Sequence, residues 1–225
     1  MNGPRRLHVY SKGWGSNSYY VLDSDEQTCL YTLREKRMHW TSGPDIEVVR
    51  TSYRPELKDR PVEFVVGAVH RHTLSTTLDV YIRNQHVTLS SDGILSGGAM
   101  SYVSPRPGVG RLTWDREGMF TSSMRLIQQH GGGRATIARL ETVRWSMSKI
   151  GRLEVWDQQA GDDVLDEIVV TGLAILLVNR RKRSSTAGVG GAGAAAGAVQ
   201  RSLSAICDIT AILPLAVVLS SPDSD

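Results

Sequence analysis

Few residues in this sequence stand at spacings that support chemistry, and two histidines come closest to a metal site. His70 and His72 alternate in a segment with a strand pattern, so both imidazoles would lie on one side of it. No cysteine or carboxylate pair follows at the spacing of a zinc site. We therefore interpret them as solvent-facing residues at a strand end, and we expect neither a metal nor another cofactor.

Two further motifs contain some, but not all, of the residues that a phosphate-binding or a catalytic site requires. Gly131-Gly132-Gly133-Arg134 would present backbone N–H groups to a phosphate, but it lacks the helix start and the Lys-Ser/Thr of a phosphate-binding loop. A hairpin turn is the better interpretation. Cys29 lies inside a strand pattern with no histidine beside it, and no Gly-x-Ser-x-Gly elbow occurs. The sequence favours a non-enzymatic protein, although catalytic residues can be distant in sequence.

The strongest candidate site is a run of four cations, Arg180, Arg181, Lys182 and Arg183. Three interpretations are open. The run can complement the negative end of a helix dipole, contact anionic lipid head groups, or form a minimal nuclear import patch. Of these, contact with an anionic phospholipid or a membrane surface is the one that implies a binding function.

The cations close a segment that the sequence predicts to be a helix of about residues 163–179. Four carboxylates occupy its first two turns, where they complement the dipole, and Asp162 or Asp163 is a suitable N-cap. The rest of the helix is apolar on all sides, which is typical of a buried or membrane-spanning helix. The uninterrupted apolar run, residues 168–178, is well short of the ~20 residues that cross a bilayer. We therefore expect a buried helix.

Residues 1 to about 160 carry about ten short strand patterns separated by turn signals, which predicts an antiparallel sandwich or barrel. Residues 19–22 and 28–33 form an expected hairpin. Val62, Phe64, Val66 and Ala68 alternate as the buried face of one strand, and Asn84-Gln85 is an expected turn. The expected strands are residues 19–22, 28–33, 46–51, 62–68, 78–83, 86–89, 111–114, 124–129, 135–140 and 152–156.

The strands and the helix place complementary demands on the fold. A sheet with one apolar face must bury that face, and a helix that is apolar all round must be covered on every side. A barrel closed around the helix meets both demands and removes exposed sheet edges. The predicted fold is therefore mainly β, an antiparallel barrel that encloses one hydrophobic C-terminal helix.

The composition of the chain excludes few classes of function. The 225 residues are 40% hydrophobic and carry a formal net charge of +3, which is compatible with an anionic partner without requiring one. The tryptophans are scattered rather than grouped as a base-stacking platform, so no nucleic acid partner is expected. Two cysteines imply no disulfide framework, and no signal peptide pattern opens the chain. We expect an intracellular location, cytoplasmic or membrane-peripheral.

The end of the chain differs in composition from the rest. Residues 1–183 form the expected barrel domain, and residues 184–200 are rich in Gly and Ala, which is typical of a flexible linker. Residues 201–225 form an apolar tail. Its run from Leu203 to Leu219 contains Asp208 and Pro214, so a poorly ordered tail or a docked helix is favoured over a C-terminal tail anchor. The sharp break in composition also fits an artefact of gene prediction.

One stretch carries a family resemblance. The run Asp166-Glu167-Ile168-Val169-Val170-Thr171-Gly172-Leu173, followed by the basic cluster, resembles a fungal domain of unknown function in the tubby C-terminal-like superfamily. The likeness covers roughly residues 7–183, and phospholipid scramblases and LURP-one-related proteins are its relatives. The resemblance implies a twelve-stranded barrel around a hydrophobic C-terminal helix, and phosphoinositide binding as a candidate activity. The basic residues that bind lipid in tubby domains match no position here.

Overall fold

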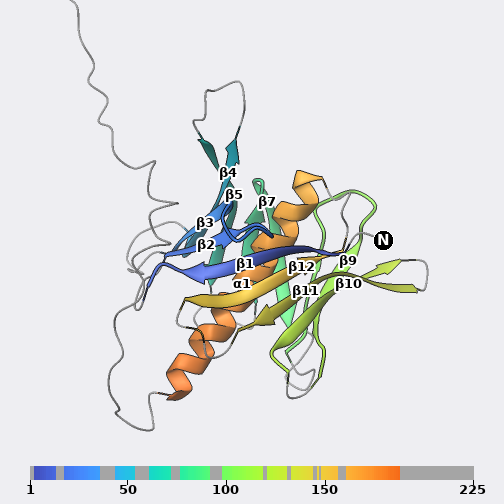
Figure 1. The fold of residues 1–225 in the computed structure, drawn as a ribbon. Coiled ribbons are helices and arrows are strands. Elements are labelled where there is room, and N and C mark those ends of the chain that lie inside the picture. Colours follow the sequence, from blue (N-terminus) through green and yellow to red (C-terminus); the bar gives the residue numbers. More distant parts are fainter. Residues whose placement is uncertain are drawn as a thin grey trace, which may run out of the picture.

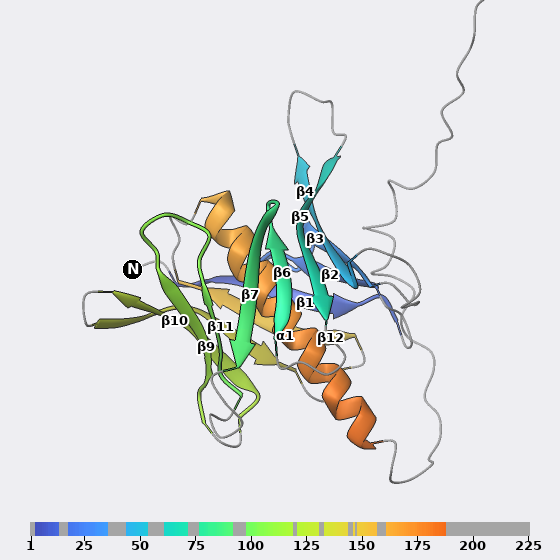
Figure 2. The same cartoon turned by 180° about the vertical axis from the view of Figure 1, so that it is seen from behind.

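The architecture is an antiparallel meander of twelve strands followed by one helix (Figures 1 and 2). The computed structural model describes residues 3–13, 18–35, 44–53, 61–71, 77–91, 98–118, 121–130, 133–143, 146, 148–156 and 161–187. Within these ranges, the side chains of Tyr53, Arg71, His130 and residues 181–187 are outside the description.

Each strand pairs with its neighbours in the sequence, and β1 pairs with β12 to close the barrel. The strands are β1 (Arg5–Ser11), β2 (Ser18–Leu22), β3 (Cys29–Glu35), β4 (Ile46–Tyr53), β5 (Pro61–Arg71), β6 (Leu78–Ile82), β7 (Gln85–Ser91), β8 (Met100–Val103), β9 (Arg111–Arg116), β10 (Ser123–His130), β11 (Gly133–Thr142) and β12 (Lys149–Val155).

The barrel encloses the helix α1 (Asp162–Ala187), as expected from its apolar surface. Every residue from Leu165 to Leu177 is buried, and the inward side chains of the strands form one continuous core with this segment. Two glycines mark the closest approaches, because a β-carbon at Gly67 of β5 would collide with Val170, and one at Gly151 of β12 would press on Leu176. Close contacts with two different strands therefore fix the position of the helix inside the barrel.

The helix runs further than the sequence suggested. It continues to Ala187, about two turns beyond the expected end at residue 179, and passes through the basic run. The cations therefore lie within the helix rather than after it. Residues 188–225 lie outside the described part of the chain, so the linker beyond Ala187 and the apolar tail stay predictions. No helix in the described ranges has both the length and the hydropathy to cross a membrane.

Ten of the twelve strands match expected segments, and the hairpin of β2 and β3 is confirmed. The sequence missed β1, whose start carries two arginines, and β8, which has only four residues. The turn between β6 and β7 is Arg83-Asn84, one residue earlier than expected. Both residues have positive φ, 46° and 68°, as in the two-residue turns that match the twist of a hairpin.

The expected buried face of β5 is right only in part. Val66 is buried as expected, but Phe64 is exposed, and Gly67 and Val69 lie against the interior. The reason is a register shift between β4 and β5, where Val48 pairs with Gly67 and the next residue, Val49, pairs with Val65. One extra residue in β5 reverses the alternation of its faces, which no period-2 pattern in the sequence reveals.

Candidate functional site

A polar cluster lies where α1 enters the barrel, and we call it the entry cluster. It consists of four carboxylates on the first turns of the helix and three arginines supplied by the barrel wall. The carboxylates belong to Asp162, Asp163, Asp166 and Glu167, and the arginines are Arg50, Arg83 and Arg106.

Asp166 is at the centre of the entry cluster and is fully buried. Its Oδ1 accepts a hydrogen bond from the hydroxyl of Tyr31 at 2.8 Å and one from Nη1 of Arg50 at 3.1 Å. Its Oδ2 accepts from Nε and Nη2 of Arg83 at 2.9 and 2.7 Å. Four donors from three strand regions thus surround one carboxylate, which offsets the cost of removing its charge from water.

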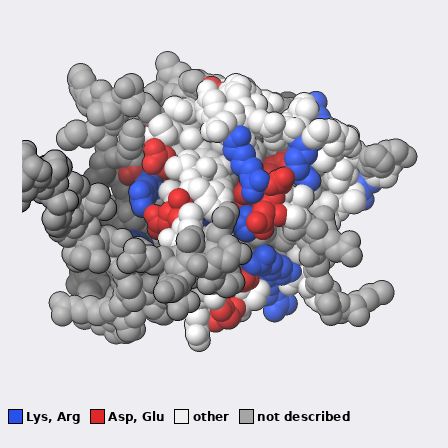
Figure 3. All heavy atoms as spheres, turned by 90° about the horizontal axis from the view of Figure 1, so that it is seen from above, with Lys and Arg blue, Asp and Glu red and all other residues white. Residues whose placement is uncertain are grey.

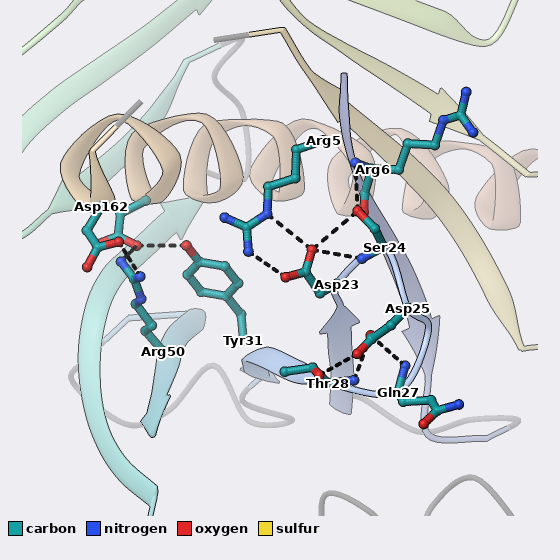
Figure 4. A network of polar contacts seen from close by, with 11 residues as sticks. Arg5, Arg6, Asp23, Ser24, Asp25, Gln27, Thr28, Tyr31, Arg50 and Asp162 are labelled. Atoms are coloured by element: carbon teal, nitrogen blue, oxygen red, sulfur yellow. Dashed lines mark hydrogen bonds and ion pairs between the residues drawn. The ribbon is translucent and has the colours of Figure 1, made fainter. Parts of the chain in front are cut away.

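The same arginines extend outward to the exposed start of the helix. Nη2 of Arg50 donates to Asp162 at 2.5 Å, and Arg83 also pairs with Asp163. Figure 4 shows Arg50 between Asp162 and Tyr31. Each arginine therefore links a buried carboxylate to an exposed one, which ties the first turn of α1 to β4 and to the β6–β7 turn.

Glu167 occupies a second buried position next to Asp166. Its carboxylate pairs with Nε of Arg106, in the loop that follows β8. Burial and the nearby negative charge of Glu167 raise the pKa of the Tyr102 hydroxyl well above its ordinary value. The hydroxyl of Tyr102 therefore stays protonated beside the carboxylate of Glu167.

The hydroxyl of Tyr31, like that of Tyr102, has a raised pKa. Burial raises the pKa of its hydroxyl, and the charge of Asp166 raises it further, although Arg50 opposes the shift. The hydroxyl remains a hydrogen-bond donor at physiological pH. Because every acid of the entry cluster pairs with an arginine and the tyrosines stay protonated, we interpret the entry cluster as a clamp on the helix rather than a reactive centre.

The sequence located these carboxylates but not their partners. Asp166 and Glu167 were expected only to complement the helix dipole, and the structure shows that both are also fully buried and paired with arginine. The expected N-cap is wrong. The carbonyl of Gly161 accepts the N–H groups of Val164 and Leu165, while the carboxylates of Asp162 and Asp163 bind arginines.

A second polar cluster lies on the outer face of β1 and is centred on Glu26. The carboxylate of Glu26 accepts from the Tyr10 hydroxyl, lies 3.1 Å from Nζ of Lys149 and lies 3.5 Å from Nε2 of His8. Glu26 has a φ of 54°, in the left-handed region that non-glycine residues enter at some cost. The Tyr10 hydrogen bond is the main cause of the lowered pKa of Glu26.

The candidate basic run lies at the other end of α1. Val178 and Asn179 are half-buried and Arg180 is exposed, so the helix leaves the barrel at this point (Figure 1). The guanidinium of Arg180 lies 5.7 Å from the centre of the Tyr19 ring, a cation–π arrangement. The side chains of Arg181, Lys182 and Arg183 lie outside the described part, so the structure places only their helical backbone.

The remaining motifs are structural where they are described. His70 packs edge-on against the ring of Tyr81, and His72 lies outside the described residues. Gly133 pairs with His130 at the β10–β11 hairpin, so the expected turn is confirmed. Cys29 is buried in β3, as its strand pattern indicated.

Surface charge is mixed on the part of the described surface that Figure 3 shows. On the face seen in Figure 3, basic and acidic side chains lie beside one another. The outer face of β11 and β12 illustrates the pattern, because Arg152 pairs with Glu141 at 2.6 Å and Arg139 pairs with Glu117 at 2.8 Å. Such exposed pairs contribute little to stability, about 0–1 kcal/mol each.

Comparisons with known proteins assign no family to the chain, because no protein-family model, curated protein or solved structure matches it.

Proposed function

We propose that this protein is a non-enzymatic barrel of the tubby C-terminal-like superfamily that contacts anionic phospholipid head groups through Arg180, Arg181, Lys182 and Arg183. The observation that carries the proposal is the position of this run on α1. It begins three residues after Leu177, the last buried residue among the helix side chains that are described, at the point where α1 leaves the barrel.

The fold supports the superfamily part of the proposal. Twelve antiparallel strands closed around a hydrophobic C-terminal helix are the arrangement that the resemblance of residues 166–173 implies. A likeness of fold does not fix a function, so the lipid part rests on the charges of the helix end.

The physical basis is the geometry of four consecutive cations on one helix. Successive residues are turned by about 100°, so the run surrounds the helix instead of forming one stripe. A membrane approached by the end of the helix would therefore meet several cations at once. Each cation near an anionic surface contributes about 1 kcal/mol, and the attraction falls off within a Debye length.

A liposome flotation assay tests the proposal. Vesicles of phosphatidylcholine alone are compared with vesicles that also contain phosphatidylserine or a phosphoinositide, at low and at physiological salt. We expect the protein to float with both anionic compositions at low salt and to be released by added salt. Replacing the four cations by Gln should lower binding by roughly tenfold or more, given about 1 kcal/mol per cation.

A matched control separates a local contact from a simple effect of net charge. Four exposed cations elsewhere on the barrel are replaced by Gln, which changes the net charge equally. These are Arg6, Arg34, Arg116 and Arg134. The control variant should keep its binding. Equal loss in both variants, or no binding to anionic vesicles at low salt, would contradict the proposal.

A second candidate function is a protein-interaction module with no lipid role. The exposed apolar side chains of Phe64 and Val65 on β5 favour it, because a partner that covered them would remove their apolar surface from water. Capture of one stoichiometric partner, unchanged by added anionic vesicles and lost in Val65→Lys, would favour this function over lipid binding.

A further inference from the structure

The last two turns of α1 combine the basic run, residues 180–183, with hydroxyl groups. Ser184 and Ser185 follow the run directly, and the helix continues through both serines to Ala187. Four consecutive cations therefore precede Ser184, and the same four stand two to five positions before Ser185. Kinases with an acidic substrate groove select serines in such a context, because the charges of the groove and of the segment are complementary.

This end of α1 projects from the barrel. Leu177 is the last buried residue among the helix side chains that are described, and Arg180 is exposed. In both ribbon views the end of the helix extends beyond the strands (Figures 1 and 2). A kinase binds its substrate segment in an extended form, and the end of a helix opens at little cost because its last turn has few backbone hydrogen bonds. The position of the two serines therefore suits modification.

The charge of a phosphate is large compared with that of the basic run. A phosphoserine carries about −1.5 to −2 charges at neutral pH, so one phosphate offsets about two of the four cations. Phosphates on both Ser184 and Ser185 would bring the formal charge of residues 180–185 from +4 to about zero or +1. A cluster of cations that binds anionic lipid by its charge loses that attraction when the charge is neutralised.

The spacing along the helix places the two serines beside these cations. Residues three and four apart are neighbours on an α-helix, so Ser184 lies one turn after Arg180 and Arg181. Ser185 has the same relation to the next pair of the run. Phosphate oxygens accept strong hydrogen bonds from guanidinium groups. A phosphate on Ser184 would therefore compete with the ring of Tyr19 for the guanidinium of Arg180, which lies 5.7 Å from the ring centre.

We propose that Ser184 and Ser185 are phosphorylated by a kinase that selects basic segments, and that the phosphates switch off the contact of the basic run with anionic lipid. The inference rests on the proposed lipid contact and adds its regulation. In each transfer the serine hydroxyl oxygen forms a bond to the γ-phosphorus of ATP, while the bond from that phosphorus to the β–γ bridging oxygen breaks. ADP leaves, and a base of the kinase accepts the hydroxyl proton.

Incubation of the full chain with ATP and the catalytic subunit of cyclic-AMP-dependent protein kinase tests the modification. This kinase selects serines that follow paired basic residues. We expect the intact mass to rise by the mass of one or two phosphates, and peptide mass spectrometry to place them on Ser184 or Ser185. The Ser184→Ala/Ser185→Ala variant should lack these phosphates. A wild-type chain that gains no phosphate at either serine would overturn the proposal.

Liposome flotation then separates the switch from the lipid contact itself. Unmodified and phosphorylated chains are compared at low salt on phosphatidylcholine vesicles that also contain phosphatidylserine or a phosphoinositide. Each phosphate should lower binding by roughly tenfold or more, because it offsets about two cations. The Ser184→Ala/Ser185→Ala variant, treated with the kinase, should bind as the unmodified chain does, which controls for phosphate added elsewhere.

The two possible failures give different results in this assay. Equal flotation of the phosphorylated and unmodified chains would overturn the switch and leave the lipid contact in place. An unmodified chain that does not float with either anionic lipid would overturn the lipid contact and the switch together.

Discussion

The hydroxyl of Tyr31 on β3 donates a hydrogen bond of 2.8 Å to the carboxylate of Asp166 on α1, although 135 residues separate them in the sequence. This contact joins an early strand of the barrel to the helix that the barrel encloses. It forms only when the helix has reached its final depth, because Asp166 is then surrounded by Tyr31, Arg50 and Arg83. The entry cluster therefore sets the position of α1 along the barrel axis.

Removing the central carboxylate should be costly. Asp166→Ala leaves Arg50, whose side chain is 14% exposed, without its buried partner, and breaking a buried pair in this way costs about 3–5 kcal/mol. Asp162→Ala removes a carboxylate of 69% exposure that binds the same arginine, and should cost less than about 1 kcal/mol. Urea denaturation followed by circular dichroism measures both. Equal losses of unfolding free energy would show that the buried ion pair stabilises the protein no more than the exposed one.

A hydrogen bond inside the barrel gives a second prediction. Nε1 of Trp114 donates to the hydroxyl of Thr171 at 3.1 Å, and both residues are fully buried. Thr171→Val keeps the shape but leaves the indole N–H unpaired, which should cost about 1–3 kcal/mol. Thr171→Ser keeps the hydroxyl and loses one methyl group, about 0.8 kcal/mol. The order of the unfolding midpoints checks this, and a Val variant more stable than the Ser variant would contradict it.

The stability of the protein should fall as the pH drops through the ordinary range of histidine. Burial lowers the pKa of His8, and Lys149 lowers it further with help from Arg152 and Arg6, whereas Glu26 raises it. Because the folded pKa lies below the unfolded value of about 6.5, the unfolded chain binds more protons near that pH. The stabilisation is therefore present above about pH 6.5 and is lost below it.

Chemical denaturation at a series of pH values measures this effect. His8→Gln should flatten the decline between about pH 7.5 and pH 5.5, since it removes the titrating group. The same substitution at His86, whose side chain is 49% exposed, controls for the loss of an imidazole and should leave the His8 contribution in place. An unchanged slope in His8→Gln would show that another group causes the decline.

Local patterns in the sequence predicted the barrel and its helix because each depends on neighbouring residues. Leu78, Val80 and Ile82 alternate and are buried as expected, and the apolar run of α1 required cover on all sides. The entry cluster depends on contacts between distant residues. Arg50 and Asp166 are 116 residues apart, and no spacing links them. The available signal was the pair Asp166-Glu167 standing directly between Leu165 and the apolar run.

The contact between Gly67 and Val170 gives the most specific test of how closely the barrel fits its helix. A β-carbon at Gly67 would lie 2.5 Å from Cγ2 and 2.7 Å from Cγ1 of Val170, closer than packed atoms allow. Gly67→Ala should therefore destabilise the protein by about 1–3 kcal/mol through overpacking. Val170→Ala alone should also destabilise it, because it leaves a cavity. In the double variant the methyl group added at position 67 occupies the space that Val170 vacates, so the combined loss in urea denaturation should be smaller than the sum by about 1 kcal/mol or more.

Gly67→Ala combined with Leu176→Ala is the control. Leu176 contacts Gly151 rather than Gly67, so those two losses should add within about 0.5 kcal/mol. Additive losses in the Gly67 and Val170 pair would mean that β5 and the helix do not approach each other as closely as this.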